Sequence, residues 1–427
     1  MRCIRLGNVE VVRAVYSVVR GDDWKTMSQR VTTSHVSQED GHFEASWKSE
    51  LDEMAFSWEG RVWSDGKKLE IETTGISGQE YQSRRTGMCV LHPREISGLA
   101  CTVRHNDGSV EEGTFPRSIE PDQPFFDIKS IQHAVSNGRI SIDFNGEVFE
   151  MEDQRNYSDV SYKTYVRPQA WPQPFQVQEG DQFHNGLSFT FEGDVPAVEL
   201  PCRVQFTPSE QLHNVPKLGT YGHRHKEEFD FVLDSHTPGD WGPAGIGNLH
   251  QADSFIGFNR SRILPEGADG IAFGATPQVH AFDERTIMEN AHGISDLVKN
   301  AKGFTGGKPV GVGPLALRNR RQEFEDRLET NLGPTWMLAS LLSAVEGGAD
   351  AVCALNDSEY SEELLNVIRL LRTAGQVQLM HSSDPYKALG FQTDGDQKTV
   401  LINLRPYITS VHFRGDLELE AYEIRIL

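Results

Sequence analysis

The sequence has few cysteines and no long apolar run. Its five cysteines, among 427 residues, are scattered and form no Cys-x-x-Cys pair. This pattern argues against a disulfide framework or a structural zinc site and favours a reducing compartment. No stretch approaches the ~20 apolar residues that a membrane helix needs, and the first twenty residues lack the features of a signal peptide. We therefore expect a cytoplasmic protein without a membrane span.

Positive charge is also in short supply. Lys and Arg number 41 against 62 Asp and Glu, which gives a formal net charge of −21. Nucleic acid and anionic membranes need a positive protein surface, so we expect neither as a partner. A small acidic molecule remains compatible, because one local group of basic side chains is enough to bind it. The expected partner is a small molecule, and self-association is left open.

Two common enzyme signatures are missing. There is no Gly-x-Ser-x-Gly segment, so a serine esterase mechanism has no support. The glycine-rich stretch 311–316 contains Pro314, which lacks the backbone N–H that a phosphate would need, and no suitably placed acidic residue follows it. We therefore expect no dinucleotide and no other cofactor.

Short strand-like runs fill the chain up to about residue 215. They include 9–20, 43–47, 56–63, 69–73, 87–91 and 98–104, and turn signals such as Asp65-Gly66 separate them. Strands at this spacing, with few helical patterns between them, predict an antiparallel β-sandwich.

After residue 216 strands and helices alternate. The expected strands are 269–274, 309–313, 349–355 and 376–380, and the expected helices are 285–300, 336–345 and 361–373. Alternation predicts parallel βα units, but a complete (β/α)₈ barrel takes roughly 250 residues. We expect a β-sandwich over 1–215, an abridged TIM-barrel-like βα domain over 216–385, and a C-terminal β appendage over 386–427. The barrel-like region should not close into eight strands on its own.

The densest chemistry lies in the segment 149–165, which reads FEMEDQRNYSDVSYKTY. Its carboxylates cannot all be buried unpaired, so Arg155 and Lys163 are their expected partners. Aromatic and charged side chains together favour the wall of a cleft that binds a polar ligand such as a sugar acid. A structural ion-pair cluster is the alternative interpretation.

Further candidates follow the predicted strands of the βα region. His280 and Asp283 lie just beyond the strand 269–274, where the active sites of βα proteins collect. A histidine there can act as a general base or bind a substrate hydroxyl, or it can cap the next helix. Arg260, beside Asn259, and Arg318 would suit a carboxylate, although each alone is more often part of a surface salt bridge.

Histidines are concentrated between residues 213 and 250. The run His223-Arg224-His225, followed by Glu228, has the spacing of a metal site on a strand. The surrounding sequence has no strong strand pattern, so we expect no metal.

Several segments together resemble the D-apionate lactonase family. They are GMCVLHP at 87–93, PDQPFFDI at 121–128, the EDQRN block at 152–156 and TPQVHAFD at 276–283. The resemblance implies a role in the breakdown of the branched sugar apiose, and a barrel with β-rich flanking domains like that of clan-A glycoside hydrolases. In that clan the general acid ends the fourth barrel strand, which falls in the abridged region here.

The leading hypothesis is a carbohydrate-acid hydrolase that opens a sugar lactone. Lactone opening needs a base to activate water, donors for the oxyanion and an acid for the leaving alkoxide. The candidate catalytic residues are Glu152, Asp153 and His280. The candidate substrate-binding residues are Arg155, Asn156, Lys163, Asn259, Arg260, Asp283 and Arg318.

We expect Glu152, Asp153, Arg155 and Asn156 to line one concave surface together with His280. Two alternatives stay open. One is a glycoside hydrolase that uses two carboxylates, whose separation would set the stereochemical outcome. The other is a sugar-binding relative without catalysis.

Overall fold

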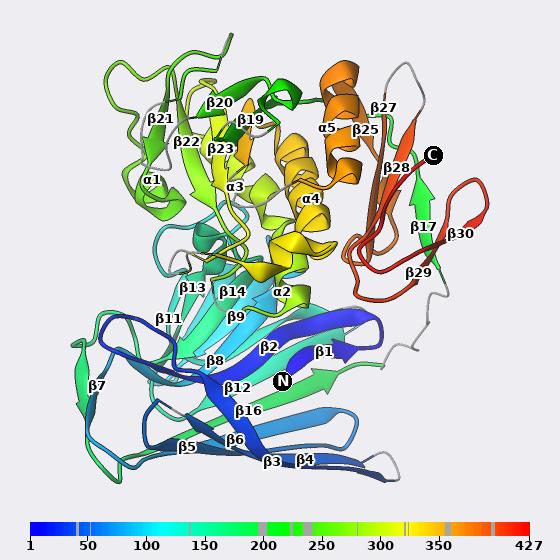
Figure 1. Ribbon diagram of the computed structural model, residues 1–427. Coiled ribbons are helices and arrows are strands. Elements are labelled where there is room, and N and C mark those ends of the chain that lie inside the picture. The colour runs from blue at the N-terminus through cyan, green and yellow to red at the C-terminus, as the bar shows by residue number, and fades with distance from the viewer. Residues whose placement is uncertain are drawn as a thin grey trace. The chain divides into compact units, whose positions relative to one another are not determined.

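The computed structural model describes residues 1–39, 42–51, 53–135, 138–194, 203–222, 225–233, 241–243, 245–279, 281–319, 322, 324–354, 360–393 and 398–427. The chain divides into two compact units (Figure 1). Unit 1 comprises Met1–Asp153 and Ser161–Leu200, and unit 2 comprises Gln154–Val160 and Pro201–Leu427. The division into 1–215, 216–385 and 386–427 stays a prediction. Among the described residues, every helix is too short or too polar to cross a membrane.

Unit 1 is built on one long antiparallel sheet. Its strand order is β1-β2-β8-β14-β13-β11-β12-β16-β6-β5-β4-β3, with β9 paired to β11 and β10 to β9. A separate pair joins β7 to β15. The strands are β1 (Arg2–Leu6), β2 (Val9–Arg20), β3 (Gln29–Glu39), β4 (His42–Leu51), β5 (Phe56–Ser64), β6 (Lys68–Ser77), β7 (Tyr81–Ser83), β8 (Arg85–Pro93), β9 (Ala100–His105), β10 (Val110–Thr114), β11 (Phe125–Val135), β12 (Gly138–Asn145), β13 (Phe149–Asp153), β14 (Ser161–Val166), β15 (Phe175–Val177) and β16 (Gln182–Glu192), and one 3₁₀ turn, η1, spans Arg94–Ile96.

This sheet folds over onto itself. Ser17 of β2 donates to Thr73 of β6 at 3.4 Å, although six strands separate β2 from β6 in the sheet order. The backbone N–H of Met88 in β8 likewise donates to Asn185 of β16 at 3.0 Å. One apolar core, which draws on β2, β6, β8 and β16 among others, fills the interior. The predicted antiparallel β-sandwich is therefore confirmed, since two layers of one sheet enclose a common core.

Alternation along the strands of unit 1 creates a second, outer face. In β13, Phe149 and Met151 belong to the core, so Glu150 and Glu152 point the other way. On β8 all nine residues are buried. Its outward Cys89 packs with Tyr165 of β14 in a small cluster separate from the core. The outer face of β8, β13 and β14 is therefore covered as well.

Unit 2 contains a six-stranded parallel sheet in the order β20-β19-β24-β23-β22-β21. β19, the first of these six strands along the chain, pairs with β24, the last of them, as in a (β/α) barrel. Among the described residues, the sheet edges are the consecutive strands β20 and β21. The sheet is thus an incomplete barrel, as predicted. Its strands are β19 (Lys217–Tyr221), β20 (Phe231–Leu233), β21 (Leu249–Ala252), β22 (Gly270–Ala275), β23 (Val310–Leu315) and β24 (Ala351–Ala354).

Two details of this sheet differ from the sequence prediction. The first strand expected in this region was 269–274, yet β19, β20 and β21 precede it. The predicted fourth parallel strand, β25 (Gln376–Leu379), instead pairs antiparallel with β18 and β27 in another sheet. Its alternating sequence Gln-Val-Gln-Leu suits a strand with one buried face, whereas all four residues of β24 are buried.

The helices of unit 2 are α1 (Phe255–Ser261), α2 (Glu284–Asn290), α3 (Gly293–Lys302), α4 (Leu332–Gly347) and α5 (Glu362–Ala374), with 3₁₀ turns η2 (Gln154–Tyr157), η3 (Lys226–Glu228) and η4 (Asp326–Glu329). The single helix predicted over 285–300 is in fact α2 and α3. At the junction the backbone makes bonds between residues three apart, from the N–H of His292 to the carbonyl of Glu289 at 3.3 Å and from the N–H of Ile294 to that of Ala291 at 3.4 Å. The carbonyl of His292, the N-cap of α3, also accepts from the hydroxyls of Ser295 and Ser343.

The C-terminal strands form two further sheets in unit 2. Their orders are β26-β17-β29-β30 and β18-β25-β27-β28-β31. A core that includes Phe206, Met380, Leu401 and Val411 draws residues from both sheets. The additional strands are β17 (Val204–Thr207), β18 (Leu212–Asn214), β26 (His381–Ser382), β27 (Ala388–Thr393), β28 (Thr399–Asn403), β29 (Thr409–His412), β30 (Asp416–Leu419) and β31 (Ile424–Ile426).

Candidate functional site

Glu152 and Lys163 form an ion pair on the outer face of unit 1. They are directly opposite each other on the neighbouring strands β13 and β14. The Nζ atom of Lys163 lies 3.3 Å from Oε2 of Glu152. The predicted partnership between this lysine and a carboxylate of the EDQRN region is therefore confirmed.

The two members of this pair differ in solvent exposure, and the more buried of them, Lys163, has a shifted pKa. The Lys163 side chain is 2% exposed and that of Glu152 is 17% exposed. Burial lowers the pKa of Lys163 to about 8, while the Glu152 carboxylate opposes this effect and Arg20 and Arg85 add to it. Lys163 is therefore still mostly protonated at pH 7, and its proton is held weakly enough to titrate under mildly alkaline conditions.

A second acidic contact lies beside this pair on the same face. The Tyr165 hydroxyl donates to Oε1 of Glu150, and the backbone N–H of Gln169 donates to the same oxygen at 2.6 Å. The Arg85 guanidinium lies 3.6 Å from the centre of the Tyr165 ring. We call Arg85, Glu150, Glu152, Lys163 and Tyr165 the β13–β14 cluster. It combines two carboxylates with two buried cations in a water-poor setting.

Asp153 does not belong to this cluster. It follows Glu152 in the strand and therefore points to the opposite face, where it is fully buried. Its Oδ2 accepts from the backbone N–H of Glu120 at 3.2 Å. The expectation that Glu152 and Asp153 line one surface is wrong, because neighbouring residues of a strand face opposite sides.

The last three residues of the EDQRN block belong to unit 2, in η2, where Arg155 and Asn156 are both buried. Asn259 of α1 donates through Nδ2 to Oδ1 of Asn156 at 2.9 Å. Asn300 of α3 in turn donates to Oδ1 of Asn259 at 3.1 Å. Two predicted substrate-binding residues, Asn156 and Asn259, are thus brought together. They join in a buried amide chain that fastens η2 to two helices.

The remaining candidates lie around α1 and beyond the strands β22 and β23. His280 lies outside the described residues. Asp283 is the N-cap of α2 and accepts from the N–H of Thr286 at 3.0 Å and from its hydroxyl at 2.7 Å. Arg318 donates to the carbonyl of Gln322 at 3.0 Å. Arg260 is exposed in the last turn of α1.

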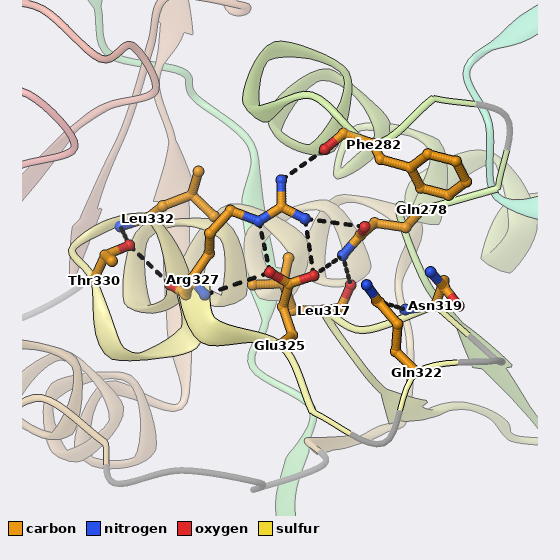
Figure 2. Close-up of polar contacts among 9 residues, drawn as sticks. All are labelled: Gln278, Phe282, Leu317, Asn319, Gln322, Glu325, Arg327, Thr330 and Leu332. Carbon is orange, nitrogen blue, oxygen red and sulfur yellow. Dashed lines mark hydrogen bonds and ion pairs between the residues drawn. The ribbon is translucent and has the colours of Figure 1, made fainter. Parts of the chain in front are cut away.

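Beyond β22 and β23 the structure assembles a polar group that the sequence analysis missed. The carboxylate of Glu325 accepts from Arg327 at 2.6 and 2.8 Å and from Gln278 at 2.5 Å (Figure 2). Arg327 also donates to Oε1 of Gln278 and to the carbonyl of Phe282. Hydrogen bonds from Arg327 hold the pKa of Glu325 below its ordinary value.

This Glu325 group ties together the segments that follow β22 and β23. Every Glu325 contact named above satisfies a buried charge, so the group is best suited to positioning the loops at the carboxyl end of the sheet. Its sequence signal is faint, consisting of an acidic and a basic residue two positions apart in a charged loop. Only the fold brings Gln278 to them from 47 residues away.

Nothing among the described residues supports a metal site. His223 lies outside them, and His225 follows β19 in a left-handed turn rather than on a strand. Glu228 accepts from Arg369 at 2.8 Å. Within the part of the chain that the structure describes, no group of three His, Cys, Asp or Glu side chains is placed to hold a metal ion.

A curated relative shares part of this sequence. D-apionate lactonase from Brucella anthropi is 35% identical over 193 residues, which cover 44% of this chain and 32% of the relative. The matched part of this chain thus spans about a third of that protein's length.

Solved structures give weaker likenesses. An α-galactosidase of glycoside hydrolase family 36 from Geobacillus stearothermophilus shares 7% identity at a TM-score of 0.30, covering 96% of this chain and 88% of its own. A β-arabinopyranosidase shares 8% identity at a TM-score of 0.32, covering 98% and 93%.

Two family models match separate parts of the chain. The N-terminal domain of D-apionate lactonase matches residues 1–194, which contain the β-sandwich strands β1 to β16. The TIM barrel domain of D-apionate lactonase matches residues 251–356, from the end of β21 to just beyond β24. The predicted resemblance to the D-apionate lactonase family is therefore confirmed in both domains.

Proposed function

We propose that this chain is a hydrolase that opens the lactone of a sugar acid, and that Glu152 is its general base. The observation that carries the proposal is the Glu152–Lys163 pair in a domain matched by the lactonase family. Glu152 keeps some exposed surface and therefore can meet a substrate, whereas Lys163 is buried beside it. The ammonium favours the ionised form of the carboxylate, which is the form a base requires.

The chemical steps follow from that assignment. Glu152 takes a proton from water as the water oxygen attacks the lactone carbonyl carbon. The tetrahedral intermediate then collapses and breaks the ring C–O bond. The departing alkoxide takes the proton back from Glu152, which leaves a ring-opened acid that ionises in solution. One carboxylate can therefore serve in both proton transfers.

The other predicted site residues have supporting roles in this proposal. His280, Asp153, Arg155 and Asn156 were predicted to assist with proton transfer or to polarise the carbonyl. The geometry favours Glu152 over Asp153, because Asp153 faces the core side of β13. Arg260 and Arg318 are the predicted contacts for a sugar-acid carboxylate, and Asp283 is a further predicted substrate contact. Protonated guanidinium groups suit that ligand, while Asp283 would bind hydroxyls.

The test is a screen of the purified protein against γ- and δ-lactones of sugar acids and against aryl glycosides, with acid release followed in a pH-stat. The proposal expects faster lactone opening than in buffer alone and no glycoside cleavage. Lactone rates equal to the buffer rate across the panel would refute it. Cleavage of aryl glycosides instead would favour the two-carboxylate alternative.

A sugar-binding relative without catalysis is the second candidate. The incomplete barrel favours it, since β20 and β21 are sheet edges among the described residues and active sites of such barrels gather strand ends from the whole ring. Saturable binding of a sugar acid or lactone, without any acceleration of lactone opening, would support this candidate over the first.

A further inference from the structure

A cavity of about 730 Å³ lies in unit 2, and none of its lining residues belongs to the groups described above. Several elements contribute to it, namely β18, α3, α4 and the strands β25, β26 and β27. Its volume falls in the range of small-molecule sites. The lining residues are Ser209, Gln211, His213, His292, Lys299, Ala339, Leu342, Ser343, Glu346, Leu379, Met380, His381, Ser382, Ser383, Pro385, Leu389 and Gly390.

The cavity lining is rich in hydrogen-bond donors. Lys299 of α3 pairs with Glu346 of α4, with Nζ 2.8 Å from Oε1. The imidazoles of His213, His292 and His381 line the same cavity. One ammonium and three imidazoles therefore accompany a single carboxylate in the lining, and their N–H groups suit the oxygens of an anionic ligand.

Ser382 provides a second, independent observation. The residue is 6% exposed, and its hydroxyl has no hydrogen-bond partner among the residues that the structure describes. Its neighbours are satisfied, because Ser383 accepts from the N–H of Gln205 and Ser343 bonds both Ser295 and His292. A buried polar group without a partner is rare in folded proteins. A ligand hydroxyl or carboxylate in the cavity would satisfy it.

The lining also has an apolar part. Leu342, Met380 and Leu389 contribute aliphatic and thioether groups to it. Leu342 and Met380 are themselves buried in the protein. These groups suit the carbon skeleton of a small molecule, as the donors suit its polar groups. The cavity thus combines the two surfaces that a small organic anion requires.

We propose that this cavity binds a small polyhydroxylated carboxylate, of the size of a sugar acid, at a site separate from the β13–β14 cluster. Its carboxylate contacts Lys299 and the neighbouring imidazoles, and a ligand oxygen accepts from Ser382. The proposal does not depend on lactone hydrolysis, because it uses none of the residues assigned to that reaction.

The test is isothermal titration calorimetry of the full chain with sodium D-gluconate as the probe. Ser382→Ala removes a hydroxyl that makes no hydrogen bond to any residue that the structure describes, so the fold should be kept. Lys299→Ala removes the cation. The matched control is Lys302→Ala, since Lys302 lies on the same helix and makes a similar half-exposed pair with Asp350 at 2.9 Å.

The wild-type chain should bind gluconate saturably, and each cavity variant should bind at least ~10-fold more weakly, as expected for loss of a hydrogen bond to a charged group. The control should bind like the wild type. Wild-type-like binding by both Ser382→Ala and Lys299→Ala, or no saturable wild-type binding, overturns the proposal. Binding of inorganic phosphate as tight as that of gluconate would overturn the assignment to a carboxylate.

Discussion

The ammonium of Lys163 is buried on the outer face of unit 1 and is paired, at 3.3 Å, with the less buried carboxylate of Glu152. In this pair the ammonium is therefore protected from solvent, whereas the carboxylate is partly accessible. Removal of the accessible carboxylate would leave a buried cation without this partner. Any experiment on Glu152 must accordingly separate an effect on chemistry from an effect on folding.

The first prediction concerns Glu152→Gln. The amide keeps the shape of the carboxylate but cannot exchange a proton near neutral pH. We expect lactone turnover to fall by ~10²–10⁴. A purely structural pair predicts instead a loss of about 3–5 kcal/mol in unfolding free energy at pH 7. Activity assays and melting curves on the same preparation separate the two effects.

A control variant and a measurement at a second pH help to separate the catalytic effect of Glu152→Gln from its structural effect. Glu147→Gln changes an exposed carboxylate that pairs with Arg167 at 3.4 Å, and it should alter neither activity nor melting. Any destabilisation by Glu152→Gln should shrink at pH 9, where much of Lys163 has lost its charge. Wild-type turnover in Glu152→Gln would show that Glu152 is not the base.

The second prediction concerns pH and Lys163 itself. The pKa is about 8 in the folded protein against 10.5 for an ordinary lysine. Below pH 8 both states hold the proton, so the folded state bears the full cost of burying the charge. Between pH 8 and 10.5 the unfolded state binds more protons, so stability rises with pH in this window. Above it both forms are neutral.

Lys163→Met should remove this dependence, because a thioether of similar length does not titrate. We expect urea unfolding of both proteins from pH 7 to 10.5 to show this difference. Across the window, the unfolding free energy of the wild type should rise by about 1–3 kcal/mol relative to that of the variant. A stability difference that stays constant with pH would contradict a lowered pKa. The test uses the difference in unfolding free energy between the two proteins, because other groups titrate in both and their effects cancel in that difference.

The third prediction concerns the amide chain of Asn156 and Asn259. Each single change to Ala leaves a buried amide partner unsatisfied and should cost about 1–3 kcal/mol in unfolding free energy. The double variant should cost less than the sum, with a coupling of about 0.5–3 kcal/mol. A role confined to substrate binding predicts a raised KM with unchanged melting, and that result would contradict the structural assignment.

The fourth prediction concerns Asp283 as a helix cap. Asp283→Ala should destabilise the protein by about 0.5–2 kcal/mol, because α2 loses a side-chain acceptor at its first turn. Asp283→Asn keeps an oxygen in the same place and should remain close to the wild type in thermal unfolding. If Asp283 also binds substrate through its charge, Asp283→Asn should raise KM for a sugar lactone while it preserves the melting temperature.

Local signals predicted the elements that depend on local sequence. Val9–Arg20 is a strand as its apolar run indicated. The predicted helix 361–373 is α5, and Ser361 caps it by accepting from the N–H of Leu364 at 3.3 Å. The strands β20 and β21 escaped prediction because they have only three and four residues, and pairing with β19 and β22 defines them.

The candidate site was predictable in part. Opposite charge within one segment correctly indicated a pair that includes Lys163. The period of two along a strand already implies that Glu152 and Asp153 face opposite sides, and this signal in the sequence went unused. The contacts of Asn156 with Asn259, and of Gln278 with Glu325, join residues far apart in the chain. No local pattern encodes those partners.

The pairing of β19 with β24 also bears on how unit 2 forms. Lys217 of β19 lies opposite Ala351 of β24. β19 therefore has β20 as a neighbour early, but it can pair on its other side only once β24 is present. Contacts of such long sequence separation slow folding, because a large loop must close before the pairing stabilises anything. During synthesis β19 leaves the ribosome well ahead of β24. Completion of this sheet therefore has to await the synthesis of β24, and shortening the chain before β24 would leave β19 with β20 as its sole parallel neighbour among the described strands.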